Sequence, residues 1–226
     1  MLSQEYSMRE ITFYFDYVSN NAYLAWTQLH KLIEKHDVTI RPVPILFAGL
    51  LNTHGNVGPA EIPAKRDWML KNILRKCTLL GVPMSPPVHH PFDPLLALRM
   101  SSLDFPEDKR WQLIDRIFRA VWVDRLHVSD AEVLARLAED IGLEGAELVT
   151  AAQSEEAKKS LRQQTESAVA LGVFGIPSMV WDGELFFGYD DFAFLTLALE
   201  GRDPLLQAQL ESWQMKNMAA SSVRSR

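Results

Sequence analysis

The sequence predicts an α/β protein in which an opening β-α-β unit and a closing β-β-α unit are separated by a long all-helical stretch. Three observations carry this prediction. An aromatic strand pattern beginning at Thr12 passes through a polar turn at Ser19 into a helical pattern. A second strand pattern follows that helix. Near the other end of the chain, Asp182-Gly183 between two apolar runs is a strong hairpin signal.

The composition is that of an ordinary globular protein. The chain has 226 residues, of which 47% are hydrophobic and 23% charged, enough for one large domain or a domain with a sizeable insertion. The formal net charge is -6 and the pI is near 5.5. No long Lys/Arg run occurs, so we expect no nucleic-acid surface. No apolar run approaches the roughly 18 residues that a membrane span needs, so we expect no membrane segment.

The numbers and positions of cysteine and histidine argue against an internal disulfide and against a metal site. Cys77 is the single cysteine, so no internal disulfide can form, and its apolar helical neighbours predict a core thiol. The stretch from Met1 to Glu5 lacks the layout of a signal peptide, and we expect a reduced, cytoplasmic protein. The six histidines show no metal-ligand spacing with an acidic partner, and we expect no metal site.

The opening unit is predicted from local patterns. A helix is expected over 22–36, where apolar residues recur on one face. A strand is expected over 38–46. It contains Pro42 and Pro44, which cannot donate to a ladder, so this strand should lie at a sheet edge. Strand, helix and strand in this order imply two parallel strands joined by a right-handed crossover.

The middle of the chain changes character. The segment 47–63 is rich in turn residues and is predicted to be a loop. A capping box, Ser129-Asp130-Ala131-Glu132, should open a helix that ends near Gly142, and short helical segments continue to about Leu171. The other expected helices span 64–80, 94–103 and 106–123. We interpret the whole stretch 64–171 as an inserted helical domain, because a strand pattern resumes after it.

The closing unit completes the topology. The expected elements are a strand over 173–181, a second strand over 184–187, a helix over 191–200 and a further helix over 205–215. The order β-α-β, helical insert and β-β-α is that of a thioredoxin-like fold. We therefore predict a thioredoxin-like domain formed by 9–63 and 172–216, and a flexible tail over 217–226.

The turn after the first strand is the candidate centre of chemistry. Thioredoxin-like folds normally carry Cys-x-x-Cys at this turn, but here it is Ser19-Asn20-Asn21-Ala22, so the chain cannot cycle a disulfide there. The first N–H groups of the following helix lack partners, and the helix dipole favours an anion at this point. Without an adjacent base, Ser19 is better suited to donate a hydrogen bond to an anion than to act as a nucleophile.

Four motifs point to a family. They are Tyr14-Phe15-Asp16-Tyr17-Val18-Ser19, Gly55-Asn56-Val57-Gly58-Pro59, Val173-Phe174-Gly175-Ile176-Pro177 and Phe187-Gly188-Tyr189-Asp190. In this order and spacing the chain resembles the kappa-class glutathione transferase superfamily, and most closely its bacterial branch, the 2-hydroxychromene-2-carboxylate isomerases. The resemblance extends from about Ile11 to Gly201.

The resemblance implies roles for particular residues. Ser19 would be the catalytic serine that hydrogen-bonds the glutathione sulfur, and Ile176, before a cis Pro177, would pair with the cysteinyl backbone of glutathione. The cofactor-binding set that it implies is Ser19, Asn56, Lys65, Ile176, Pro177, Phe187, Gly188, Tyr189 and Asp190. Four of these positions also have a structural interpretation: Ser19 and Asp190 as helix N-caps, Asn56 as a turn residue and Lys65 as a solvated cation.

The implied activity is a glutathione-dependent cis-trans isomerisation in aromatic-compound breakdown. Its partners would be glutathione as cofactor, a small aromatic carboxylic acid as substrate and a second copy of the chain in a homodimer. Two alternatives stay open: a kappa-class transferase or peroxidase that consumes glutathione, and a non-catalytic glutathione-binding protein. The second arises because the family usually has Ser-Pro followed by an aromatic residue, whereas this chain has Asn20-Asn21 after Ser19.

Overall fold

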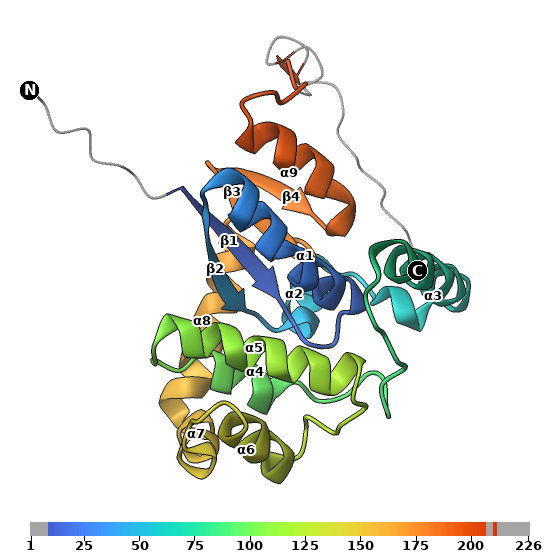
Figure 1. The fold of residues 1–226 in the computed structure, drawn as a ribbon. Helices are drawn as coiled ribbons and strands as arrows, with labels where there is room; N and C mark the ends of the chain where they lie inside the picture. Colours follow the sequence, from blue (N-terminus) through green and yellow to red (C-terminus); the bar gives the residue numbers. More distant parts are fainter. Residues whose placement is uncertain (1–8, 207–209, 212–226) are drawn as a thin grey trace, which may run out of the picture.

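A four-stranded mixed sheet lies at the centre of the protein. The computed structural model describes residues 9–206, 210 and 211 (Figure 1). The strands are β1 (Glu10–Phe15), β2 (Thr39–Pro44), β3 (Ser178–Trp181) and β4 (Glu184–Phe187), in the order β2-β1-β3-β4. β1 and β2 are parallel, and the other pairs are antiparallel. The predicted α/β fold with a thioredoxin-like core is thereby confirmed.

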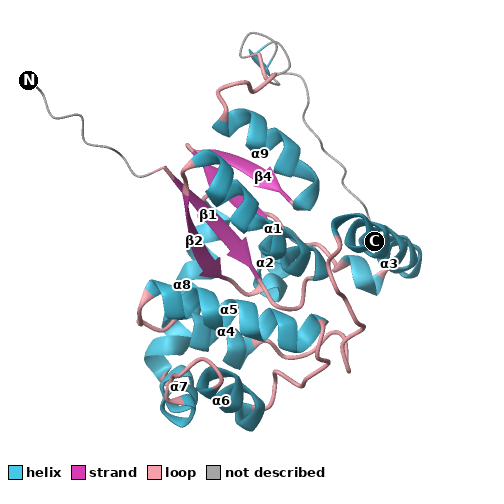
Figure 2. Cartoon of the chain, viewed as in Figure 1, coloured by secondary structure: helices cyan, strands magenta, loops and turns pink. Residues whose placement is uncertain are grey.

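Helices surround this sheet (Figure 2). They are α1 (Asn20–His36), α2 (Phe47–His54), α3 (Pro63–Leu80), α4 (Leu95–Ser101), α5 (Glu107–Trp122), α6 (Ala131–Glu139), α7 (Gly145–Ala152), α8 (Glu155–Ala170) and α9 (Phe192–Leu199), with short 3-10 helices at Pro59–Glu61 and Tyr189–Asp191. Figure 1 shows α4 to α7 grouped at one end of the sheet, while α3 lies at its side.

Alternation along β1 divides the core between the two faces of the sheet. Phe13 and Phe15 point to the face covered by α1, where Phe118 of α5 packs against Phe15 with ring centroids 5.5 Å apart. Tyr14 points to the opposite face and belongs to a cluster with Ala168 of α8. The helical stretch between β2 and β3 thus shares a core with the sheet. The limits 9–63, 172–216 and 64–171 remain a prediction.

The edge position of β2 was predicted correctly. It pairs with β1 alone. The missing N–H groups of Pro42 and Pro44 therefore cost no hydrogen bond to a second neighbouring strand. The strand expected over 173–181 is shorter than predicted, because β3 begins only at Ser178. Pro177 has no N–H with which to extend the ladder.

The loop expected over 47–63 is wrong in its first half, where α2 forms instead. Leu50 is fully buried against the cluster that includes Ala168, so tertiary packing stabilises this short helix. Gly55, at φ 62°, ends it, and the segment is irregular from there to Pro59.

The predicted capping box before α6 is also wrong in detail. The N-cap is Asp130, whose side chain accepts a hydrogen bond from the N–H of Glu132 at 2.8 Å. Ser129 instead donates its hydroxyl to the carbonyl of Asp93 at 2.8 Å, and so ties the start of α6 to the segment before α4.

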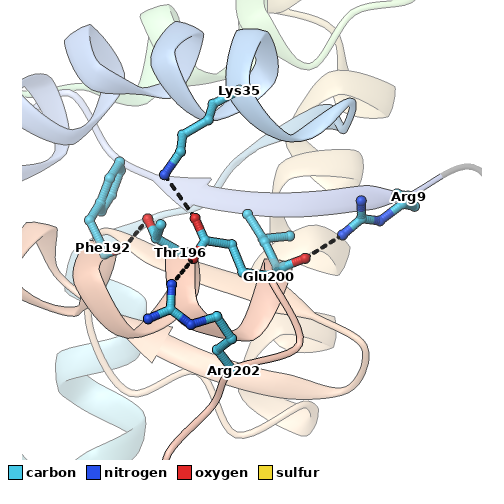
Figure 3. A network of polar contacts seen from close by, with 7 residues as sticks. Arg9, Lys35, Phe192, Thr196, Glu200 and Arg202 are labelled. Atoms are coloured by element: carbon cyan, nitrogen blue, oxygen red, sulfur yellow. Dashed lines mark hydrogen bonds and ion pairs between the residues drawn. The ribbon is translucent and has the colours of Figure 1, made fainter.

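The closing helix is tied to α1 by polar contacts (Figure 3). Lys35 at the end of α1 pairs with Glu200 at 2.8 Å, and Arg202 pairs with the same carboxylate at 2.9 Å. Arg9 donates to the carbonyl of Leu199 at 2.8 Å. Exposed ion pairs add little stability, so these contacts chiefly fix the orientation of α9 on the α1 face.

Two predictions fall outside the described residues. The helix expected over 205–215 lies mostly there, and the tail over 217–226 lies there entirely. None of the helices in the described ranges has the length and apolar content required to cross a bilayer.

Candidate functional site

Ser19 occupies the junction between β1 and α1. Its backbone is extended (φ −94°, ψ 116°), and its Oγ accepts a 3.1 Å hydrogen bond from the N–H of Ala22. Its carbonyl accepts from the N–H of Tyr23, also at 3.1 Å. This is the geometry of a helix N-cap. Because Oγ uses a lone pair toward Ala22, the hydroxyl proton is left to donate to a ligand.

The start of α1 presents further donors. Within the described residues, no acceptor lies within hydrogen-bond distance of the N–H groups of Asn20 and Asn21. No acidic side chain occupies the first turn of this 17-residue helix. Free N–H groups and the positive end of the dipole therefore coincide beside Ser19, an arrangement that favours an anion.

Three side-chain contacts hold the turn before Ser19. Asp16 Oδ1 accepts from the N–H of Val18 at 3.1 Å, and Trp122 Nε1 donates to the carbonyl of Tyr17 at 3.0 Å. The imidazole of His90 lies 2.9 Å from the carbonyl of Val18. Side chains from the turn itself, from α5 and from the segment between α3 and α4 thus fix the backbone that presents Ser19, which is how a preorganised site is built.

Asp16 is the one fully buried carboxylate of this region. Its second oxygen accepts from the N–H of Phe47 at 2.9 Å, at the start of α2. Burial raises the pKa of Asp16 to about 7, although the N–H groups of Phe47 and Val18 oppose that shift and the nearby charge of Asp93 adds to it. The prediction of site residues missed Asp16. A lone acid in an otherwise apolar strand was the available signal.

The loop before β3 faces the same edge of the sheet. Tyr14 pairs with Ser178, so Ile176 and Pro177 lie across from the point where β1 ends. The bond between Ile176 and Pro177 is cis, as predicted. Among the described residues, neither the N–H nor the carbonyl of Ile176 has a hydrogen-bond partner, which leaves both backbone groups available to a ligand.

The structure brings the predicted motif after β4 against this loop. The N–H of Gly188 donates to the carbonyl of Pro177 at 2.8 Å, with Gly188 at φ 72°. The ring of Phe187 covers Gly175 so closely that a Cβ there would lie 2.6 Å from the ring. Asp191 accepts from the N–H of Phe187 at 2.7 Å and stands at the N-cap position of α9, which corrects the N-cap interpretation of Asp190.

Asp190 instead pairs with α3. Lys76 Nζ lies 2.6 Å from one carboxylate oxygen of Asp190 and 6.0 Å from the centre of the Tyr189 ring. The lysine side chain is 16% exposed and that of Asp190 73%. Burial raises the pKa of Tyr189, and the charge of Asp190 adds to the effect. Sequence reasoning missed Lys76, because nothing local marks its contact with a residue so distant in the chain.

Asn56 and Lys65 stand apart from these groups. Both side chains are exposed, and no hydrogen bond or ion pair in the described part of the chain joins either one to the turn at Ser19. Their predicted roles remain predictions. Cys77 is buried as expected, its Sγ 3.8 Å from the sulfur of Met84, and burial raises the pKa of its thiol.

Comparisons with known proteins agree with this architecture. A family model described as a DSBA-like thioredoxin domain matches residues 10–200. The chain is 27% identical over 195 residues to 2-hydroxychromene-2-carboxylate isomerase from Pseudomonas putida, covering 84% of this chain and 93% of that protein. It is 25% identical over 205 residues to Glutathione S-transferase kappa 1 from Rattus norvegicus, covering 84% and 91%.

A solved structure agrees as well. That of a selenomethionine 2-hydroxychromene-2-carboxylate isomerase matches with a TM-score of 0.78 at 25% identity, covering 91% of this chain and 100% of that one. The predicted fold and the predicted resemblance are confirmed by these matches.

Proposed function

The chain belongs to the DSBA-like thioredoxin domain family, and on that premise we propose that it is a glutathione-dependent cis-trans isomerase of the 2-hydroxychromene-2-carboxylate type. The observation that carries the proposal is the open N-terminus of α1. There a hydroxyl and two free backbone N–H groups stand where disulfide enzymes of this fold hold cysteine. A site that stabilises a sulfur anion without supplying one suits a thiol cofactor.

The donors at this turn are strong enough to ionise a thiol near neutral pH. A free cysteine thiol has a pKa of about 8.5, and lowering it to about 6.5 requires ~2.7 kcal/mol in favour of the thiolate. One hydrogen bond to a charged acceptor contributes ~1.5–3 kcal/mol. A helix N-terminus adds ~0.3–1 kcal/mol, and up to about 2 in partly buried sites. Ser19, which is half-buried, and the start of α1 therefore suffice without a base.

The residues around the turn suit the rest of glutathione, an extended peptide with two carboxylates and an ammonium group. The unpartnered backbone of Ile176 would pair with the peptide. Asp190 would accept from the ammonium group of the γ-glutamyl end, with Tyr189 beside it. α3 carries five basic residues against the single acid Asp67, so its charge favours the carboxylates.

Asn56, Lys65, Phe187 and Gly188 complete the proposed binding set. Lys65 lies in the first turn of α3, where the dipole mildly disfavours a cation, so an anionic ligand would explain its placement. Phe187 and Gly188 would act by holding the loop of Pro177 in place, since Gly188 donates to the carbonyl of Pro177.

Glutathione, when bound, supplies a sulfur that adds reversibly to an unsaturated carbon, which allows rotation about the former double bond. Ser19 would donate a hydrogen bond through its hydroxyl to that sulfur whenever the sulfur carries charge. The helix N-terminus would lower the free energy of the same charged state, and the fixed backbone of Tyr17 and Val18 would keep both donors in position. The proposed substrate is a small aromatic carboxylic acid of catabolism, in the cytoplasm.

Relatives named Glutathione S-transferase kappa 1 favour a second candidate, a transferase or peroxidase that consumes glutathione. Counting thiols separates the two. We expect 2-hydroxychromene-2-carboxylate to be isomerised only when glutathione is present, with total thiol unchanged. Depletion of thiol with chloronitrobenzene, and no isomerisation, would favour the transferase. Binding of glutathione with neither reaction would leave a non-catalytic binding protein.

The homodimer is likewise part of the proposal. α3 exposes several large apolar side chains, namely Trp68, Leu70, Leu74 and Leu79. Trp68 and Leu79 share one face of this helix, and Leu70 and Leu74 share another, so α3 offers two exposed apolar strips for association. Light scattering should give twice the chain mass of 25.7 kDa for the native protein. A monomer at micromolar concentration would contradict this part of the proposal.

A further inference from the structure

A cavity of about 500 Å³ lies between α2, α4 and α8. Its volume is within the range of small-molecule sites. Its aliphatic lining draws on both core clusters: Leu46, Leu95 and Leu161 pack with the cluster of Phe13, and Val169 packs with that of Tyr14. None of the residues proposed above to bind glutathione lines it.

Three cations line this cavity. Arg99 comes from α4, and Lys158 and Arg162 come from α8, whereas Glu166 is the single acidic lining residue. Lys158 pairs with Glu155 at 2.6 Å. The hydrogen bond and charge of Lys158, with the charges of Arg99 and Arg162, lower the pKa of Glu155, so this carboxylate offsets part of the positive charge. In the described part of the chain, neither Arg99 nor Arg162 forms a hydrogen bond or an ion pair with a carboxylate. With Glu155 and Glu166 beside Arg99, Lys158 and Arg162, the cavity keeps one net positive charge.

Arg99 gives a second, independent indication. Its Nε is buried and has no hydrogen-bond partner among the described residues. Buried donors are nearly always satisfied, because desolvation without a partner is unfavourable. An anion bound in the cavity would supply the acceptor that this guanidinium lacks.

The remaining walls are aliphatic. They are formed by Leu46, Leu95, Leu161 and Val169. The lining hydroxyls already have partners: Thr165 donates to the carbonyl of Leu161 and accepts from the N–H of Leu46, and Thr53 donates to the carbonyl of Gly49. The cavity thus offers cations and apolar surface but few free neutral polar groups, which disfavours a sugar or a hydrated inorganic anion.

We propose that this cavity is a binding site for a small alkyl carboxylate, with Arg99 and Arg162 on the carboxylate and the alkyl chain against Leu46, Leu161 and Val169. Arginine suits this role because its planar fork matches a carboxylate. The site is separate from the turn at Ser19, so it binds whether or not glutathione is present.

Titration calorimetry with octanoate, without glutathione, tests the proposal. We expect octanoate to bind, 1-octanol and inorganic phosphate to bind far more weakly, and high salt to weaken octanoate binding. Arg99→Gln and Arg162→Gln should each weaken it about ten- to a hundred-fold. Arg136→Gln, an exposed change on α6 away from the cavity, should leave it unchanged.

Several outcomes would overturn the proposal. Octanoate affinity unchanged in both arginine variants would place the binding elsewhere, and equal affinity for 1-octanol would remove the role of charge. Phosphate binding as tight as that of octanoate would remove the role of the aliphatic walls. Should Arg99→Gln fail to fold, judged by circular dichroism, the exposed Arg162→Gln still decides. Because no glutathione is used, failure here is distinct from failure of the proposed isomerase.

Discussion

Replacing Asp16 by Asn should remove a pH-dependent contribution to stability. The wild-type carboxyl has a pKa of about 7 in the folded protein, raised by burial from an ordinary value of 3.8. Between these pH values the folded state holds a proton that the unfolded chain has lost. The free energy of unfolding therefore falls as pH rises through this window. About three pKa units correspond to roughly 4 kcal/mol, an upper bound for this group.

The variant should also lose a hydrogen bond. Both carboxylate oxygens of Asp16 accept from backbone N–H groups, those of Val18 and Phe47. The amide NH2 of Asn would face one of these donors and leave it unsatisfied, at a cost of about 1–3 kcal/mol. We thus expect Asp16→Asn to be less stable than wild type at pH 4 and to approach or exceed it at pH 8.

Urea unfolding followed by tryptophan fluorescence measures this directly. Trp26 and Trp122 are both buried in the core that unfolds, so their emission reports the transition. The exposed Asp182→Asn, in the hairpin turn, is a matched control that should keep the wild-type slope with pH. Parallel stability curves for wild type and Asp16→Asn from pH 4 to 8 would show that Asp16 does not titrate as inferred.

Three further changes probe the site. Asn20→Pro removes one backbone N–H and introduces a residue that helices accept at their first position. The thiol pKa of bound glutathione should therefore rise by about 1–2 units without loss of thermal stability. An unchanged thiol pKa would show that this N–H does not stabilise the thiolate. Lys76→Met should weaken glutathione binding about ten-fold by calorimetry. The free energy of unfolding should change by less than about 1 kcal/mol, because Asp190, the partner of Lys76, is mostly exposed. Equal glutathione affinity in wild type and variant would show that Lys76 is not part of the binding site. Gly175→Ala should lower the free energy of unfolding by about 1–3 kcal/mol, because the new methyl group would meet the ring of Phe187. In a Phe187→Ala background the same change should cost much less. Equal losses in the two backgrounds would contradict the close contact between Gly175 and Phe187.

Local signals were sufficient for much of the fold. The prolines of β2, the hairpin turn at Asp182-Gly183 and the start of α1 at Ser19 each follow from a few neighbouring residues. The position of Ser19 at a helix N-terminus needed no knowledge of the rest of the chain. The cis bond before Pro177 came from the family resemblance, since the local sequence does not require it.

The missed features depend on contacts between distant segments. α2 has only eight residues, and its start is held by two backbone N–H groups, one bonded to Asp16 and the other to Thr165. The bond from the N–H of Phe47 also explains why Asp16 was missed as a site residue, because its burial depends on contact with α2. The pairing of Lys76 with Asp190 joins positions 114 residues apart, which no periodicity indicates.

The thiol pKa of glutathione bound to Ser19→Ala tests the central claim most directly. Ser154→Ala is a matched control, since Ser154 caps α8 through the same 3.1 Å bond to a backbone N–H and lies outside the proposed site. Thiolate absorbance against pH should give a pKa near 6.5 for wild type and Ser154→Ala, and a value at least about one unit higher for Ser19→Ala, with glutathione still bound in all three. The same pKa in Ser19→Ala and wild type would contradict the account.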